Sequence, residues 1–247
     1  MGVFQPWRAL PGKGVLLVLN GLSAVALIYE GYNQGVYGGI SGTPGFIAMS
    51  KIGAGNKVDQ PIKQGGLAAS YYFGAMIGAF LGGYVGDKLG RKKGAFIGSL
   101  LSLVGSALQC GSVNADMFIV ARVISGLGIG FINNIVLSWV SELSEAHDRG
   151  STFSLVFVSN FLGIFIANWI NFGIRDQSPA FRWRFPLGFM CIPMFLVAVI
   201  IFFVPGKSLL VFALRKKLTS ISRISEMAHG KSSSRRSNRD SVQNQRR

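Results

Sequence analysis

The sequence is poor in the side chains that most enzymes and metal sites need. Only two histidines and two cysteines occur among 247 residues, and 10 acidic residues face 25 basic ones. His147 and His229 have no nucleophile or acid partner nearby, so no catalytic constellation is predicted. Cys110 and Cys191 lie within apolar runs, where cysteine behaves as a small hydrophobic residue. Enzymatic chemistry, a disulfide, a metal site and a cofactor are therefore not expected.

Charge is also scarce, and it is unevenly placed. Charged residues make up 14% of the chain and hydrophobic ones 49%, with 33 glycines and 19 phenylalanines. An average soluble domain carries about 25% charged residues. The net charge is +15, but eleven Lys or Arg and only two acidic residues follow Pro205, so +9 of it lies in the tail. This distribution predicts a polytopic membrane protein with no nucleic-acid partner.

A short charged turn sets the predicted topology. Residues 83–93 read Gly-Tyr-Val-Gly-Asp-Lys-Leu-Gly-Arg-Lys-Lys, and the uncharged runs 67–85 and 94–113 flank the charged part of this turn. About 20 apolar residues cross the roughly 30 Å hydrocarbon core of a bilayer. Four of the seven residues 87–93 are Lys or Arg. We therefore expect two membrane spans joined on the cytoplasmic side.

Counting outward from this turn predicts an all-α membrane protein of six transmembrane helices, with both termini in the cytoplasm. Residues 1–13 form a cytoplasmic lead, 14–205 the six-helix bundle, and 206–247 a basic, serine-rich tail with too few apolar residues for a core. Residues 38–66 are expected to form an external loop. The basic tail either touches anionic lipid or has no specific role. The expected spans are 14–37, 67–86, 94–113, 117–140, 152–173 and 185–204.

Glycines recur at helical spacing in two of these spans. Gly74, Gly78 and Gly82 share one face of the second span, and Gly126 and Gly130 share one face of the fourth. Small residues at this spacing let helix backbones approach closely in lipid. We expect these two faces to pack against other helices.

Polar and ionisable side chains at membrane depth are costly and therefore informative. Glu30 and Asn33 share a face of the first span, and Arg122 lies in the fourth span at a similar predicted depth. Arg122 is expected to meet Glu30 or Asn33 across the bundle, which would offset the cost of burial. Such a pair either changes during transport or only holds two helices together.

The two cytoplasmic links carry opposite charges at their ends. Asp87 and Arg91 bracket the first, and Glu142 and Arg149 bracket the second. These residues either form a gate that latches the inner helix ends or only set the topology. A latch that opens in each cycle is energetically reasonable, because exposed ion pairs contribute less than about 1 kcal/mol. Their spacing does not decide between the two roles.

Five motifs resemble those of the sugar porters of the major facilitator superfamily, closest to the fungal monosaccharide and quinate-type porters. They occur in family order and cover about residues 14–205. Asp87, Lys88, Gly90 and Arg91 match the link between helices two and three. The other four resemble the segments of helix one, helix four, the link after helix four, and helix six. These segments are Gly31–Val36, Ala121–Gly130, Ser141–Gly150 and Arg182–Pro186.

The resemblance implies the amino-terminal half of a transporter, built from two three-helix repeats, that moves a monosaccharide by alternating access. It places Asp87, Arg91, Glu142 and Arg149 in the inner gate. In proton-coupled members an Asp of helix one faces the helix-four Arg, and Asn33 occupies that position here. An amide takes up no proton, so the chain is expected to be a uniporter, or a proton symporter that uses Glu30.

The chain also departs from the family. Phe157 stands where a sugar-contacting Gln is usual, which leaves Asn160 and Asn168 as the substrate-binding candidates of that helix. Helices seven to twelve do not follow Pro205, so we expect a truncated half that is inactive alone and needs a carboxy-terminal half. The alternatives are a membrane protein that regulates a full-length porter, or a sugar sensor. The expected location is the plasma membrane.

Overall fold

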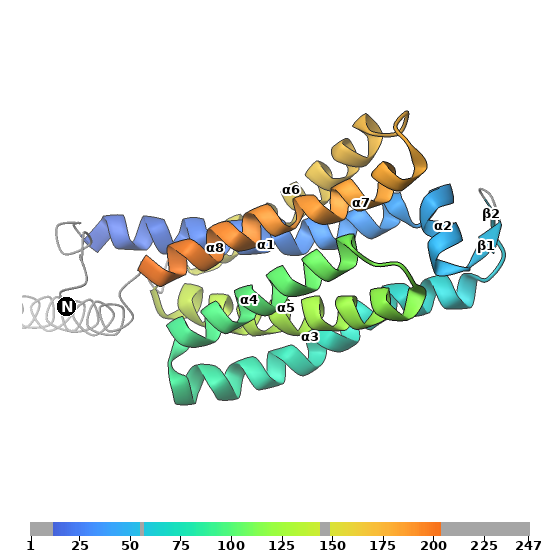
Figure 1. Ribbon diagram of the computed structural model, residues 1–247. Helices are drawn as coiled ribbons and strands as arrows, with labels where there is room; N and C mark the ends of the chain where they lie inside the picture. Colours follow the sequence, from blue (N-terminus) through green and yellow to red (C-terminus); the bar gives the residue numbers. More distant parts are fainter. Residues whose placement is uncertain (1–11, 55–56, 144–148, 204–247) are drawn as a thin grey trace, which may run out of the picture. The chain divides into compact units, whose positions relative to one another are not determined.

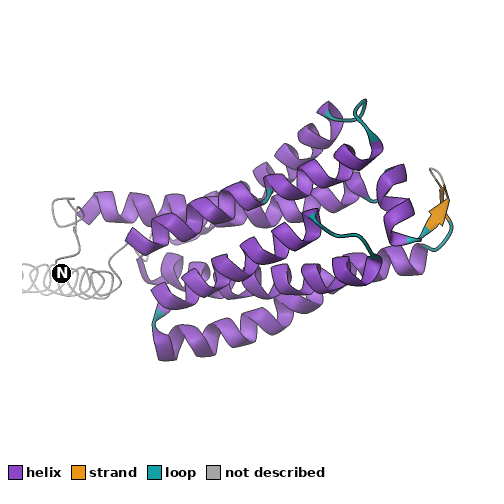
Figure 2. Ribbon diagram, viewed as in Figure 1, coloured by secondary structure: helices purple, strands orange, loops and turns teal. Residues whose placement is uncertain are grey.

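The computed structural model describes residues 12–54, 57–143 and 149–203, which form a bundle of α-helices with one short hairpin (Figures 1 and 2). The predicted lead and tail lie almost wholly outside this part of the chain. In the part described, α3 packs on α5, α4 on α5 and α1 on α6. The elements are α1 (Gly12–Ile40), α2 (Pro44–Ser50), β1 (Gly53–Ala54), β2 (Lys57–Val58), α3 (Pro61–Leu89), α4 (Arg91–Cys110), α5 (Ala115–Leu143), α6 (Arg149–Gly173), α7 (Pro179–Phe189) and α8 (Cys191–Phe203).

The six predicted spans correspond to α1, α3, α4, α5, α6 and the pair α7–α8, which confirms the all-helical bundle. Within the described residues, Arg91–Cys110, Ala115–Ser138 and Pro179–Ile201 are long and apolar enough to cross a membrane by length and composition alone. Phe157–Gly173 forms a shorter apolar helix. Helices α1 and α3 have 29 residues each, about 43 Å at 1.5 Å per residue.

Glycines bring α3 and α5 into direct backbone contact, as their spacing predicted. A Cβ added at Gly74 would lie 2.3 Å from the carbonyl oxygen of Val123, and one at Gly78 would lie 2.2 Å from that of Leu127. From the other side, a Cβ at Gly126 would lie 2.1 Å from the carbonyl oxygen of Tyr71. These distances are too short for any side chain, so only glycine permits this packing.

Close contacts between a glycine and a neighbouring backbone also join two further helix pairs. Gly105 of α4 lies against the backbone of Ser125 in α5, where a Cβ would come within 2.4 Å of its nitrogen. In α1, a Cβ added at Gly31 would lie 1.8 Å from the carbonyl oxygen of Asn160. In α6, a Cβ added at Gly163 would lie 2.1 Å from the carbonyl oxygen of Ile28. Helix α5 is therefore fixed against both α3 and α4, whereas α1 is fixed against α6.

The last span is interrupted after Phe189. Met190 separates α7 from α8, although its backbone stays helical with φ −59° and ψ −24°. Pro193 has no N–H to donate to the carbonyl of Phe189, four residues before it. The missing hydrogen bond explains why the helix is divided there.

The connection predicted over 38–66 is shorter than expected and partly folded. The first span continues to Ile40, α2 and the β1–β2 hairpin follow, and α3 already begins at Pro61. Phe46 of α2 is fully buried, with its ring 5.1 Å from that of Phe118 and 6.1 Å from that of Trp183. Seven residues with a Pro start are too few for a clear helical period, so the sequence pattern concealed this helix.

Candidate functional site

Arg122 of α5 lies in an aromatic cage rather than against a carboxylate. Its guanidinium carbon lies 4.4 Å from the centre of the Tyr37 ring, 5.5 Å from that of Tyr71 and 5.6 Å from that of Phe118. The residue is 2% exposed, and its Nε and Nη1 atoms have no hydrogen-bond partner. Cation–π attraction from three rings is the compensation that the described structure provides for this buried charge.

The predicted contact of Arg122 with Glu30 or Asn33 is not formed by these described residues. Helices α1 and α5 run antiparallel, so Tyr37, which is seven residues beyond Glu30, is the α1 residue level with Arg122. The expected span ended at Tyr37, but α1 continues to Ile40. Glu30 therefore lies about 15 Å from the carboxy-terminal end of α1 and Arg122 about 10 Å from the amino-terminal end of α5, at 1.5 Å per residue.

Asn33 belongs to a buried hydrogen-bond network centred on Tyr29. The Tyr29 hydroxyl shares hydrogen bonds with the hydroxyls of Ser106 in α4 and Ser125 in α5, both at 2.9 Å. Asn33 donates from Nδ2 to the same Ser125 hydroxyl at 3.3 Å. Three helices thus meet through fully buried polar groups. Among the side chains that make these three bonds, Asn33 has an Oδ1 atom that is buried without a hydrogen-bond partner.

Glu30 faces α5 one level deeper than Asn33. Asn133 of α5 and Tyr71 of α3 lie near its carboxyl group, although neither side chain forms a hydrogen bond to it within the described residues. Glu30 and Asn133 are both only partly buried, whereas the Tyr71 hydroxyl is buried without a hydrogen-bond partner.

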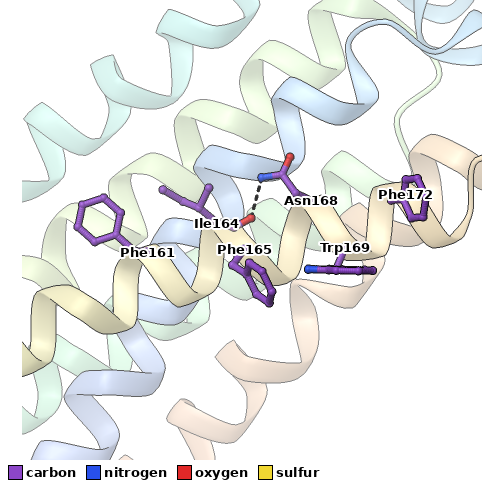
Figure 3. A pocket seen from close by; sticks show the side chains of 6 residues that line it. All are labelled: Phe161, Ile164, Phe165, Asn168, Trp169 and Phe172. Atoms are coloured by element: carbon purple, nitrogen blue, oxygen red, sulfur yellow. Dashed lines mark hydrogen bonds between the residues drawn. The ribbon is translucent and has the colours of Figure 1, made fainter.

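The two substrate-binding candidates of α6 lie in different surroundings. Asn168 is exposed and lines an open hollow of about 620 Å³, where its Nδ2 donates to the carbonyl of Ile164 at 2.9 Å (Figure 3). Asn160 is half-buried, and its backbone carbonyl meets Gly31. All lining residues of the hollow come from α6, so it has one wall. They are Phe161, Ile164, Phe165, Asn168, Trp169 and Phe172.

The predicted inner-gate residues lie at the helix ends expected for them. Asp87 is exposed in the last turn of α3 and Arg91 begins α4, with Gly90 alone between the two helices. Gly90 has φ +89°, a backbone conformation that L side chains rarely adopt, so the one-residue link requires glycine. The side chains of Glu142, near the end of α5, and Arg149, at the start of α6, lie outside the described part.

Sequence reasoning missed the tyrosines and Asn133. Tyr29 and Tyr37 lie one turn before and after Asn33, which is the signal that would have assigned them to the same helix face. Asn133 and Tyr71 carry no such signal, because their importance depends on which helices pack together. The cage and the network are properties of the assembled bundle.

The comparisons with known proteins decide the family. The family model described as "Sugar (and other) transporter" matches residues 19–226. The chain belongs to this family. The sugar-transporter relatives are longer than the chain, and similarity to them concerns only part of their length.

Three relatives illustrate this. Sugar transport protein MST6 of Oryza sativa is 30% identical over 79% of this chain and 40% of its own length. Major facilitator superfamily transporter mfsA of Aspergillus fumigatus is 30% identical over 72% and 35%, respectively. Sugar transport protein 7 of Arabidopsis thaliana is 35% identical over a shorter region, 44% of this chain and 21% of its own.

Solved structures share the fold. The proton:xylose symporter XylE matches with a TM-score of 0.68 at 20% identity, over 79% of this chain and 46% of its own. A partially occluded, inward-open structure of XylE from E. coli gives 0.68 at 21% identity, over 86% and 58%. The described helices thus have the fold of the amino-terminal half of a major facilitator transporter, as the sequence motifs predicted.

Proposed function

We propose that the chain forms one half of a transporter that moves a monosaccharide across a membrane by alternating access. Family membership is the observation that carries this proposal, and the relatives named as sugar transport proteins support the substrate class. The chain spans about half the length of the solved transporter XylE that it matches. No covalent chemistry is involved, in keeping with membership of a transporter family.

The exposed face of α6 supports a sugar-binding role. Phe161 and Trp169 are 69% and 60% exposed, and Asn168 lies between them on the helix. Small-molecule sites combine aromatic surfaces with a few polar groups that orient the ligand. The Asn168 amide can donate and accept hydrogen bonds with sugar hydroxyls. Because α6 supplies a single wall, we propose that a carboxy-terminal half supplies the other.

The first test is uptake of radiolabelled hexose in yeast cells without their own hexose carriers. The chain is expressed alone or together with helices seven to twelve of a related porter, with membrane insertion confirmed in both cases. We expect saturable uptake only in the second case, and loss of that uptake with Asn168→Ala. Asn114→Ala, in the exposed turn before α5, is the matched control. Saturable uptake by the chain alone would contradict the half-transporter proposal.

A regulatory role is the second candidate. The exposed aromatic face of α6 also suits docking onto a full-length porter of the same membrane. Co-expression with a full-length hexose carrier distinguishes the two roles. A regulator changes the uptake rate of that carrier without adding a transport activity of its own, and a half-transporter leaves the rate unchanged.

The proposed orientation places both termini in the cytoplasm and the protein in the plasma membrane. Lys88 and Arg91–Lys93 at the α3–α4 link carry the positive charge expected of an inner loop. Lys57 in the hairpin marks the opposite end of α3. In intact cells, a membrane-impermeant thiol reagent should label Lys57→Cys and not Lys93→Cys, with the unsubstituted chain as control. The reverse labelling would invert the topology.

A further inference from the structure

The two cysteines of the chain are far apart in the sequence but belong to helices that pack together. Cys110 is the last residue of α4, and Cys191 is the first residue of α8. Helix α4 packs on both α7 and α8. Both thiols are free and partly exposed. The fold therefore brings together two side chains that the sequence pattern placed in separate apolar runs.

Cys110 lies directly against α7, one turn before Cys191. Its Sγ atom donates to the carbonyl oxygen of Arg184 at 3.3 Å. A Cβ added at Gly188 would lie 3.3 Å from the same sulfur atom, so this glycine leaves room for the thiol. Arg184 in turn donates from Nη2 to the carbonyl oxygen of Ser112 at 3.5 Å. These contacts hold the end of α4 on the last two turns of α7.

Cys191 continues the face of α7 that Cys110 contacts. It follows Gly188 by three residues and Arg184 by seven, the spacing of side chains that share one face of a helix. Met190 between α7 and α8 keeps a helical backbone, so this face continues past the break. Side chains three residues apart have Cβ atoms about 5–6 Å apart. The ionisable group within electrostatic reach of the Cys191 thiol is accordingly Cys110.

The break between α7 and α8 supplies the movement that a bond between the two thiols needs. A disulfide requires Cβ atoms about 3.5–4.5 Å apart, which is less than one helical turn. Cys191 directly follows the break at Met190, and Pro193 cannot donate the hydrogen bond to Phe189 that would span it. A small bend at this point brings the first turn of α8 toward the end of α4.

We propose that Cys110 and Cys191 form a redox-sensitive pair whose disulfide ties α4 to α8 across the α7–α8 break. Hydrogen peroxide is the oxidant. One thiol sulfur attacks a peroxide oxygen, the O–O bond breaks, and the leaving hydroxide takes the thiol proton to give water and a sulfenic acid. The second thiol attacks this sulfur, the S–S bond forms, and a second water leaves. Two thiols lose two electrons, and one peroxide becomes two waters.

The position of the pair suits this chemistry. Cys110 lies at the end of α4 that the proposed orientation places outside the cytoplasm, where thiols are not kept reduced. Both thiols are partly exposed, so a molecule as small as hydrogen peroxide reaches them. On oxidation, Cys110 exchanges its hydrogen bond to Arg184 of α7 for a covalent bond to α8. Bending at Met190 is then restricted.

The test detects the bond by cutting the full chain between the two cysteines. A protease site is inserted within residues 144–148, between α5 and α6, and the chain in detergent is treated with hydrogen peroxide or with a reductant. After proteolysis and denaturation, we expect the two fragments to stay joined in the oxidised sample and to separate in the reduced one. Because the sequence contains two cysteines, Cys110→Ser and Cys191→Ser should each abolish the joined product.

A displaced thiol tests whether the position of Cys110 matters. Val113→Cys combined with Cys110→Ser keeps two thiols, but one now lies beyond the end of α4 on a residue that is 62% exposed. We expect at least about tenfold less joined product than from the natural pair at the same peroxide concentration. Equal amounts would show that the link forms by random encounter. That result, or complete separation of the fragments of the oxidised natural chain, overturns the proposal.

Hydrogen exchange measures the effect of the bond on the helix break. Backbone amides of residues 189–195 should exchange more slowly in the oxidised chain than in the reduced chain, whereas those of α6 should be unchanged. Equal exchange at the break would refute its restraint by the disulfide. Neither measurement involves sugar, so a negative result leaves the proposed transport function standing, and absence of uptake leaves the disulfide result standing.

Discussion

The guanidinium carbon of Arg122 lies 4.4 Å from the centre of the Tyr37 ring. This stacking joins the amino-terminal part of α5 to the carboxy-terminal part of α1, and the Tyr37 hydroxyl donates to the carbonyl of Gln64 in α3 at 2.7 Å. Arg122 and Tyr37 thus link three helices of the bundle. Its energetic role can be measured by substitution.

Replacing Arg122 by Lys should destabilise the bundle while keeping the charge. An ammonium group is compact and strongly hydrated, whereas the planar guanidinium group stacks on aromatic rings. We expect a loss of about 1–2 kcal/mol, the range for a desolvated cation–π contact. Thermal unfolding in detergent measures it. Arg175→Lys is the control, because Arg175 is exposed and stacks on Phe172 alone at 4.8 Å. Equal effects of the two variants would refute the cage.

Replacing Tyr37 by Phe separates the ring from the hydroxyl. The substitution keeps the aromatic face under Arg122 and removes the hydrogen bond to Gln64, so we expect a loss of about 0.5–1.5 kcal/mol. In a double-mutant cycle with Arg122→Lys the two losses should add, because the stacking is retained. Tyr37→Leu removes the ring itself, so its loss of stability should not simply add to that of Arg122→Lys. A large deviation from additivity between Tyr37→Phe and Arg122→Lys would show that the hydroxyl group, and not the ring, supports Arg122.

Replacing Tyr29 by Phe should be more costly than its small change in volume suggests. Its hydroxyl group is fully buried and bonds Ser106 and Ser125 at 2.9 Å each. Removing it deletes two buried hydrogen bonds, at about 1–3 kcal/mol in total, although Ser106 still donates to the carbonyl of Ser102 and Ser125 still accepts from Asn33. Tyr72→Phe is the matched control, since Tyr72 is 55% exposed, and a change within about 0.5 kcal/mol is expected there. Thermal unfolding midpoints of both variants are compared, and equal midpoints would contradict the prediction.

Replacing either of two glycines of α3 by alanine should change the stability of the bundle, but in opposite directions. A Cβ at Gly78 would lie 2.2 Å from the carbonyl oxygen of Leu127, so Gly78→Ala must push α3 away from α5. We expect a loss of at least about 1–3 kcal/mol, as for other overpacked sites. Gly65→Ala enters open space and should be neutral or stabilising by up to about 1 kcal/mol. A stable Gly78→Ala variant would contradict the close packing of α3 and α5.

The sequence predicted the bundle well because its strongest signals are local. Charge-free runs locate the helices, and glycines four residues apart mark the α3 and α5 faces that touch. Helix ends were less accurate: α1 runs past Tyr37 to Ile40 and α3 begins at Pro61 instead of residue 67. The solvent-facing turns of a spanning helix are not apolar, so an apolar run does not show where such a helix ends.

The candidate site was predicted in part. Asn33 and Arg122 do lie on facing sides of α1 and α5, but Asn33 bonds Ser125 and Arg122 stacks on Tyr37. Pairing in antiparallel helices depends on the level at which the helices meet, and an error of three residues moves a side chain by about 4.5 Å. Asn133 and Tyr71 could not be found from the sequence, because only the packed helices bring them near Glu30.

The glycine contacts also constrain the order in which the helices can pack during synthesis. Helix α1 ends at Ile40, but α6, whose backbone it touches through Gly31, begins only at Arg149. Likewise, the glycine face of α3 has no partner until α5 has been synthesised. During translation, the glycine faces of α1 and α3 must therefore stay unpaired, in the lipid or beside the insertion machinery, until their partner helices have been inserted. The contacts of α1 and α3 can therefore form only after α6 and α5, respectively, have been made.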